Sequence, residues 1–158
     1  MLQRTSIWVA APKDAPAVVR LLGEFRDWWG SSGPSDDEML ASVRRIMAGD
    51  DGEFLLATSQ PHGEPQAVCQ IRFRWCVWKS AEDCWLEDLY VQDAARRAGL
   101  GRALVEAAVA HAQSRGCRRI DLDVNEDNAP ARALYAACGF SFEPKAPGRT
   151  LYIARILA

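Results

Sequence analysis

The 158-residue sequence has little of what marks several specialised protein classes. It contains only two histidines, and its five cysteines show no Cys-x-x-Cys spacing, which argues against a structural metal site or a disulfide framework. No apolar run approaches the roughly 18–20 residues that span a bilayer, and the N-terminus lacks the long apolar core of a signal peptide. The net charge of −2 gives no global case for nucleic-acid binding. We therefore expect a cytoplasmic protein with reduced thiols and no metal, and with neither a membrane nor a nucleic acid as its partner.

What the sequence does contain is the material of one globular domain. Its composition, 49% hydrophobic and 25% charged, is ordinary for a soluble chain of this length. We therefore expect residues 1–158 to form a single α/β domain of the α+β type.

Local patterns predict the order β-α-α-β-β-β-α-β-α-β-β. Strand-like runs lie at 5–10, 53–59, 65–78, 85–91, 119–124, 140–142 and 151–157. Apolar residues at helical spacing lie at 14–29, 35–47, 100–114 and 128–137. Ser35 with Glu38 forms a capping-box pattern, Asn128 is an N-cap candidate, and residues 79–83 are expected to turn the chain.

The stretch from Arg96 to Ala103 joins an expected strand to a helix that opens near Leu100, and it reads Arg-Arg-Ala-Gly-Leu-Gly-Arg-Ala. Its glycines remove side-chain bulk, so backbone N–H groups can face a ligand, and the helix dipole adds partial positive charge there. The spacing lacks the Gly-Lys-Ser/Thr of a P-loop and the third glycine of a dinucleotide-binding fingerprint. It therefore predicts a phosphate or pyrophosphate site of another kind.

A second motif lies downstream, in the string Asn-x-x-Ala-x-x-x-Tyr-x-x-x-Gly-Phe that runs from Asn128 to Phe140. Together with Arg-x-x-Gly-x-Gly from Arg96 to Gly101 and the order of elements, it resembles the GNAT superfamily of N-acetyltransferases. The resemblance implies a GNAT fold: a mixed central sheet of about six to seven strands, about four flanking helices, and a splay between the two middle strands. It also implies acetyl-CoA as co-substrate.

In the resembled family, the glycine turn holds the pyrophosphate of acetyl-CoA, and an exposed strand edge pairs with the pantetheine amides. The contacts that this implies are Leu89, Tyr90, Val91, Arg96, Arg97, Ala98, Gly99, Leu100, Gly101, Arg102, Ala103, Asn128 and Tyr135. The alternative for the three arginines is that they are solvated charges at a helix start. Asn128 is expected mainly to cap its helix, near the CoA arm.

By the same resemblance, Tyr135 protonates the departing CoA thiolate. A phenol with a pKa near ~10 can donate a proton without being charged at pH 7. The alternative is that Tyr135 only packs its helix onto the sheet.

The base that takes the amine proton is expected to be Glu87. The run from Leu86 to Val91 resembles the corresponding strand of spermidine/spermine N-acetyltransferases, where the glutamate of the Glu-Asp pair is associated with base or water-relay function. Because strand residues alternate between faces, only one of Glu87 and Asp88 is expected to face a given site. Asp88 is expected to bind the amine or to be the alternative base. In another interpretation, either carboxylate forms a salt bridge with Arg72 or Arg74.

The amine acceptor is expected against the first two helices, which vary most between subfamilies of the resembled family. Asp27 and Trp28 are the candidate contacts, since an acidic and aromatic wall suits a cationic amine, although tryptophans at helical spacing are commonly core residues. We therefore expect acetyl transfer from acetyl-CoA directly to a primary amine of a small molecule, polyamine-like or otherwise cationic. The alternatives are a protein or peptide N-acetyltransferase and a CoA-binding sensor. A homodimer is expected, because many relatives pair through their last strands.

Overall fold

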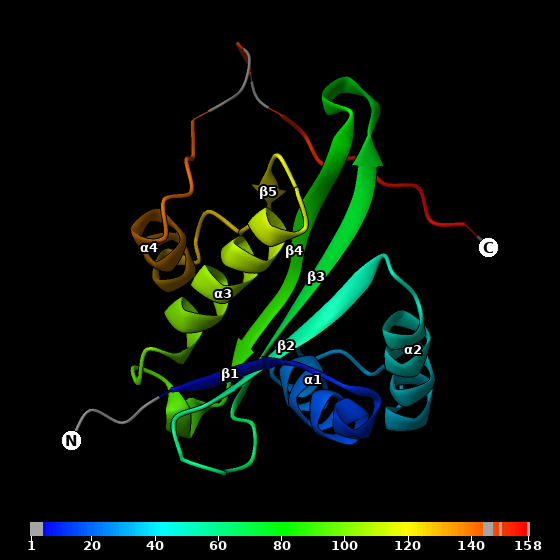
Figure 1. The fold of residues 1–158 in the computed structure, drawn as a ribbon, viewed down its shortest axis with the longest axis vertical. Helices are drawn as coiled ribbons and strands as arrows, with labels where there is room; N and C mark the ends of the chain where they lie inside the picture. Colours follow the sequence, from blue (N-terminus) through cyan, green and yellow to red (C-terminus); the bar gives the residue numbers. More distant parts are fainter. Residues whose placement is uncertain (1–4, 144–146, 149, 158) are drawn as a thin grey trace.

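The computed structural model describes residues 5–143, 147–148 and 150–157, which form a mixed five-stranded sheet with helices on both faces (Figure 1). In chain order the strands and helices are β1 (Ser6–Val9), α1 (Ala15–Trp29), α2 (Asp36–Ala48), β2 (Gly52–Thr58), β3 (Ala67–Cys76), β4 (Ala81–Val91), α3 (Leu100–Ser114), β5 (Ile120–Asp121) and α4 (Ala129–Ala137). The strands lie in the order β1-β2-β3-β4-β5, antiparallel except for the parallel pair β4–β5. The predicted α+β class and the order of the first nine elements are confirmed.

The core has two layers, one on each face of the sheet, and β2 contributes to both. Leu55 and Ala57 belong to the cluster beneath α3, whereas Phe54 and Leu56 belong to the cluster beneath α1 and α2. This alternation follows from the two-residue period of a strand. Full burial of a side chain such as Phe54, Leu55 or Leu56 stabilises the fold by roughly 1.5–3 kcal/mol. Because β2 contributes such side chains to both clusters, it stabilises the packing of the helices on both faces of the sheet.

Both predicted helix caps are confirmed. The Ser35 hydroxyl accepts the Glu38 N–H at 3.3 Å, and the Glu38 carboxylate accepts the Ser35 N–H at 2.8 Å, so α2 starts with a complete capping box. The side-chain oxygen of Asn128 accepts the Ala131 N–H at 3.2 Å at the start of α4. These contacts are local in sequence, which is why spacing alone predicted them.

The predicted bounds of β4 and β5 are wrong. β4 begins at Ala81, not near residue 85, because residues 81–84 continue the antiparallel pairing with residues 73–76 of β3. The turn is accordingly the short 3₁₀ segment Val77–Lys79. β5 ends at Asp121, although alternation continues to Val124, because only Ile120 and Asp121 pair with β4.

The sheet of six to seven strands is also wrong for the described residues, which form five strands. The predicted strand 140–142 is not formed, because the Phe140 N–H donates to the Tyr135 carbonyl at 3.0 Å and closes the end of α4. The predicted strand 151–157 is also not formed, and its apolar side chains are exposed, with Tyr152 and Ile156 at 96% and 95%. Apolar composition predicts a strand only where a neighbouring strand supplies the hydrogen bonds.

The described part of the chain shows neither a membrane-spanning helix nor a metal-binding group. None of its helices is both long and apolar enough to cross a bilayer. It holds no group of three or more histidine, cysteine, aspartate or glutamate side chains placed to bind a metal ion.

Arg115, directly after α3, joins that helix to the far end of the sheet. Its guanidinium lies 3.9 Å above the Phe73 ring and donates to the Glu82 carboxylate at 2.6 and 3.0 Å. It also donates to the Asp50 carbonyl and lies 3.7 Å from the Glu53 carboxylate. The hydrogen bond from Arg115 holds the pKa of Glu82 below its ordinary value.

Arg115→Ala is expected to lower the free energy of unfolding by about 1–2 kcal/mol at pH 7, because the lost pair is hydrogen-bonded but partly exposed. Since the pKa of Glu82 is depressed in the folded state, the stabilisation is present above the unfolded pKa, near ~4.3, and is lost as the pH falls through the folded value. Urea unfolding at pH 7 and at pH 3 measures both effects. The matched control is Arg102→Ala, which removes an exposed i,i+4 pair with Glu106 and should leave the urea midpoint unchanged. Equal losses in the two variants would contradict a special role for Arg115.

Candidate functional site

The site is centred on an irregularity in β4. Ile71 of β3 pairs with Leu86, but the next β3 residue, Gln70, pairs with Asp88, so Glu87 is an extra residue in β4. Such a β-bulge twists a strand and changes the direction of the side chains that follow it.

The bulge reverses the faces of β4. Before it, Cys84 and Leu86 pack in the core beneath α3, whereas after it Leu89 and Val91 pack there, and Tyr90 joins the core beneath α1 and α2. An unbroken strand would have kept the even-numbered residues on the α3 face. The bulge therefore turns the even-numbered residues from Asp88 onward toward α1.

Both acidic residues of the bulge make contacts on the α1 and α2 side of the sheet. Glu87 accepts a hydrogen bond from the Gln70 amide at 3.2 Å and lies 3.8 Å from the Arg72 guanidinium. Asp88 lines a pocket with residues of α1 and α2. Only Asp88 of the two lines this pocket, as expected, although the bulge rather than simple alternation sets the directions of the two side chains.

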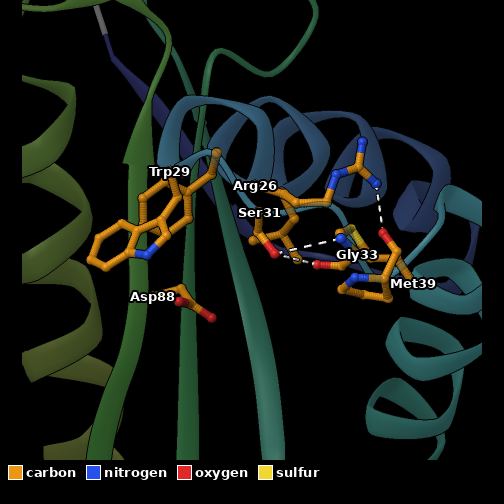
Figure 2. Close-up of a pocket in the computed structure, with 9 residues that line it drawn as sticks. Arg26, Trp29, Ser31, Gly33, Met39 and Asp88 are labelled. Atoms are coloured by element: carbon orange, nitrogen blue, oxygen red, sulfur yellow. Dashed lines mark hydrogen bonds between the residues drawn. The ribbon is translucent and has the colours of Figure 1, made fainter.

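The pocket over Asp88 has a volume of about 330 Å³ and lies between β4, α1, α2 and the loop that joins the two helices (Figure 2). Figure 2 shows the Trp29 indole above Asp88, with Ser31, Gly33 and Met39 along one side. The lining is mainly apolar and consists of Leu22, Phe25, Arg26, Trp29, Ser31, Gly33, Pro34, Met39 and Asp88. It is suited to a small group that presents a cation to a single carboxylate.

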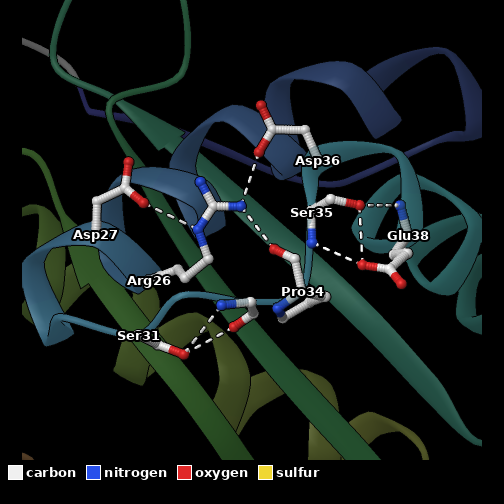
Figure 3. A network of polar contacts seen from close by, with 8 residues as sticks. Arg26, Asp27, Ser31, Pro34, Ser35, Asp36 and Glu38 are labelled. Carbon is white, nitrogen blue, oxygen red and sulfur yellow. Dashed lines mark hydrogen bonds and ion pairs between the residues drawn. The ribbon is translucent and has the colours of Figure 1, made fainter.

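The wall formed by the α1–α2 loop is held in place by Arg26 (Figure 3). Its guanidinium donates to the Asp27 carboxylate at 2.9 Å, the Pro34 carbonyl at 2.7 Å and the Asp36 carboxylate at 2.8 Å. Across the loop, the Ser31 hydroxyl donates to the Gly33 carbonyl at 2.8 Å. These bonds fix the loop against both helices and so give the pocket a defined shape.

The electrostatic environment separates the two bulge carboxylates. Burial, followed by the nearby charges of Glu87 and Asp123, raises the pKa of Asp88 to about 6. Glu87 is instead 43% exposed and is held by the Gln70 amide and Arg72. Asp88 thus exchanges its proton close to neutral pH, which is the property that a general base requires.

On the other side of β4, the strand has an open edge. Pairing with β5 is confined to Cys84–Ile120 and Trp85–Asp121, so residues 86–91 have no β5 partner. Their backbone amides and carbonyls can therefore pair with an extended ligand, as the predicted contacts of Leu89, Tyr90 and Val91 require.

The start of α3 supplies an anion site beside this edge. Gly99 caps the helix with φ +80°, and the first helical bond runs from the Ala103 N–H to the Gly99 carbonyl at 3.0 Å. The N–H groups of Leu100, Gly101 and Arg102 precede that bond and have no acceptor within the helix. With the helix dipole behind them, they fit a pyrophosphate. The arrangement therefore suits acetyl-CoA, which carries a pyrophosphate and an amide-bearing arm.

The three arginines at this turn differ in their partners. Arg96 donates to the Val91 carbonyl at 3.2 Å and lies 2.8 Å from the Asp93 carboxylate, and Arg102 is paired with Glu106 at 2.7 Å. Arg97 is exposed, adopts φ +68°, and has no ion pair with another described residue. Among the three, Arg97 is the cation that the described structure leaves available for a phosphate.

Tyr135 of α4 is 7% exposed and packs edge-on against Phe140, with ring centroids 5.7 Å apart. Burial raises its pKa to about 12, and the charges of Cys69, Asp123, Cys138 and Asp88 contribute. The phenol therefore keeps its proton at neutral pH and can donate a hydrogen bond. The influence of Asp88 on this pKa indicates that the predicted donor and the bulge carboxylate share one electrostatic environment.

Other predicted contacts are less central. Asp27 pairs with Arg26, and neither Asp27 nor Trp28 lines the Asp88 pocket. Trp28 is 58% exposed and stacks on Phe25 with centroids 6.1 Å apart. Phe25 and Met39 were not predicted to line the pocket, because apolar residues at this spacing in helices are typical of the hydrophobic core. Gln70 was not predicted either, although a polar residue among the apolar residues at 67–71 of β3 was an available signal.

A helix start with free N–H groups beside an open strand edge, close to a carboxylate whose pKa is raised by burial, suits an acyltransferase that uses a nucleotide-bearing thioester. The chain belongs to the acetyltransferase (GNAT) family, which matches residues 18–140. It is an N-acetyltransferase, and the acetyl donor of its family is acetyl-CoA.

Several known proteins are similar to this chain. Aminoglycoside N(6')-acetyltransferase type 1 of Stenotrophomonas maltophilia is 32% identical over 135 residues, which cover 83% of this chain and 82% of that protein. Thialysine N-epsilon-acetyltransferase of Bos taurus is 32% identical over 137 residues, which cover 80% of this chain and 78% of that protein. Mycothiol acetyltransferase of Amycolatopsis mediterranei is 34% identical over 138 residues, 82% of this chain but only 43% of that protein.

Solved structures share the fold. A candidate acetyltransferase from Arthrobacter sp. FB24 has a TM-score of 0.84 and 31% identity, covering 96% of both chains. AAC(6')-Iy, solved with a bisubstrate analogue of CoA, has a TM-score of 0.78 and 19% identity, covering 98% of this chain and 99% of that one.

Asp88→Asn is expected to stabilise the protein at alkaline pH. Because the pKa of Asp88 is about 6 in the folded state, the folded protein binds this proton more tightly than the unfolded chain does. Ionisation of Asp88 therefore lowers stability as the pH rises from ~4 to ~6, and removing it should raise the free energy of unfolding by up to about 3 kcal/mol at pH 8 and by much less at pH 4. Chemical unfolding at the two pH values measures this difference.

The exposed Asp127 gives a control, because Asp127→Asn should change stability little and without this pH dependence. The desolvated state of Asp88 would be refuted by a variant that is no more stable than the wild type at pH 8.

Proposed function

We propose that this protein transfers the acetyl group of acetyl-CoA directly to the primary amine of a small molecule bound in the Asp88 pocket. The observation that carries this proposal is the carboxylate of Asp88, with a pKa of about 6, in a mainly apolar pocket on the strand whose edge is open. A protonated amine is attracted both to this carboxylate and to the faces of Phe25 and Trp29. The carboxylate also offers a place for the proton that the amine must lose.

The donor side of the proposal rests on the predicted contacts. The N–H groups at the start of α3, with Arg97, hold the pyrophosphate, and the β4 edge at Leu89–Val91 pairs with the pantetheine arm. Asn128 lies at the start of α4 and acts mainly as its cap. Acetyl-CoA supplies the activated acyl group, while the protein fixes its orientation and handles the protons.

Asp88, rather than Glu87, is the better candidate for the base. A base works best when its pKa lies near the working pH, and Asp88 meets this condition. Glu87 makes polar contacts with Gln70 and Arg72 that favour a fixed negative charge. The neutral phenol of Tyr135 is the candidate that protonates the leaving thiolate.

The acceptor class is supported by the size of the pocket and by the relatives. A volume of about 330 Å³ suits a small amine or the end of a longer one. Named relatives are acetyltransferases for aminoglycosides and thialysine, both of them amine-bearing small molecules. We therefore favour a cationic small-molecule amine over a protein substrate.

Turnover with an amine panel tests the proposal directly. Polyamines, aminoglycosides, amino acids and peptides are incubated with acetyl-CoA, and the free thiol of CoA is followed. Acetylation of small amines is expected. Peptide-only turnover would replace the proposal with a protein acetyltransferase, and binding of acetyl-CoA without turnover on any amine would replace it with a CoA sensor.

Two matched substitutions test which carboxylate is the base. Asp88→Asn is expected to lower kcat by ~10²–10⁴-fold, as loss of a general base does. Glu87→Gln should retain activity and move the acidic limb of the pH–rate profile to lower pH, because it removes a charge that raises the pKa of Asp88. The opposite pattern, with activity lost only in Glu87→Gln, would assign the base to Glu87.

Tyr135→Phe separates chemistry from packing. The substitution keeps the ring that contacts Phe140 and removes only the hydroxyl. We expect kcat to fall at least tenfold while the Kd for acetyl-CoA, measured by calorimetry, stays within about threefold, as for loss of a proton donor. An unchanged kcat would leave Tyr135 with a packing role alone.

A homodimer remains a prediction. The segment 150–157 carries exposed apolar side chains, and such surfaces commonly mark contacts between chains. Light scattering during gel filtration would measure the mass in solution.

A further inference from the structure

A second hollow is also lined by a residue of the bulge, Glu87. It has a volume of about 500 Å³ and lies over the outer halves of β3 and β4. Its lining consists of Asp51, Arg72, Phe73, Arg74, Asp83, Cys84, Trp85, Glu87 and Asp121. Glu87 lines this hollow while the next residue, Asp88, lines the acceptor pocket, so the bulge borders both spaces.

The carboxylates of the second hollow are already compensated. The Arg72 guanidinium lies 3.1 Å from Asp51, and the Gln70 amide donates to Glu87 at 3.2 Å. Elsewhere in the hollow, Asp83 accepts from Lys79 at 3.0 Å and Asp121 accepts from Arg119 at 2.6 Å. The hollow therefore offers a ligand little uncompensated negative charge.

Arg74 differs from these groups. It lines the hollow and is exposed, and its side chain makes no ion pair or hydrogen bond with another described residue. The indole of Trp85, 37% exposed, lines the same space. An unpaired guanidinium beside an aromatic wall is suited to a carboxylate, which it can bind through two parallel hydrogen bonds.

The spacing between Arg74 and Asp88 fits one molecule. Gln70 pairs with Asp88, and Arg74 lies four residues along the same strand, roughly 13 Å away at about 3.3 Å per residue. The flexible arginine side chain shortens the distance that a ligand must span. An amine at Asp88 and a carboxylate at Arg74 can therefore belong to the two ends of a single short chain.

We propose that the second hollow binds a carboxylate at the far end of the acceptor, so that the substrate is an amino acid whose reacting amine is separated from its carboxylate by an extended chain. This inference rests on the proposed function, since it assigns the amine end to the Asp88 pocket. It distinguishes the acceptor from a plain polyamine, which has no group for Arg74.

The test compares ω-amino acids with their own primary amides, which have the same shape without the charge. 4-Aminobutanoate, 6-aminohexanoate and 8-aminooctanoate and the three amides are assayed with acetyl-CoA by release of free thiol. At the best chain length, kcat/KM for the acid should exceed that for the amide by about tenfold or more, as a hydrogen-bonded charge implies. Calorimetry with CoA present measures the same preference without turnover.

Arg74→Gln should reduce this preference to within about twofold and lower kcat/KM for the acid much more than for the amide, because the charge-assisted contact is removed. Arg74→Lys should restore part of it. The matched control is Arg44→Gln, which removes an exposed arginine of α2 that lines neither space and should preserve the preference.

The possible failures are distinguishable. Equal use of acid and amide at every length, or an equal loss for both in Arg74→Gln, would overturn the carboxylate site while leaving amine acetylation intact. Efficient acetylation of polyamines alone would do the same. If acetyl-CoA binds but no amine is acetylated, the proposed function itself fails. In that case calorimetry still tests the carboxylate site, which equal binding of acid and amide would overturn.

Discussion

The site depends on one extra residue in one strand. Without the bulge at Glu87, alternation along β4 would direct Asp88 into the apolar core beneath α3, where an ionised carboxylate is costly. With it, Asp88 lies in the pocket beside α1, and Glu87 contacts Gln70 on the same side. The bulge thus converts a local break in pairing into a defined spatial relation between two carboxylates.

β4 also explains how donor and acceptor come together. Its face after the bulge belongs to the acceptor pocket, and its edge beyond Trp85 is released by the short β5. The chain then leads directly into the turn at Gly99 that starts α3. One strand therefore sets the positions of Asp88, the open edge and the turn at Gly99, to which the proposed function assigns the amine, the pantetheine arm and the pyrophosphate.

Features that depend on neighbours in sequence were predictable. The Ser35 capping box, the Asn128 cap and the glycine turn at Gly99 are each specified within a few residues. Features that depend on the pairing of strands were not predictable. The bulge exists only in the register between β3 and β4, and a strand at 151–157 would need a neighbouring strand, which its own composition cannot indicate. The direction of the Asp88 side chain could not be predicted for the same reason, because it depends on the bulge. That Asp88 belongs to a site was nevertheless indicated by the position of a carboxylate in the middle of a strand.

Glu87 and Asp88 consequently differ in their electrostatic environment. The amide of Gln70 donates to the carboxylate of Glu87, and the Arg72 guanidinium lies 3.8 Å away, so this partly exposed charge is held in place. That fixed charge then opposes the ionisation of Asp88, which burial already disfavours. The buried polar residue at position 70, between the apolar Cys69 and Ile71, is therefore explained by its contact with Glu87 rather than by the core. It helps to maintain the charge that keeps Asp88 ready to exchange a proton near neutral pH.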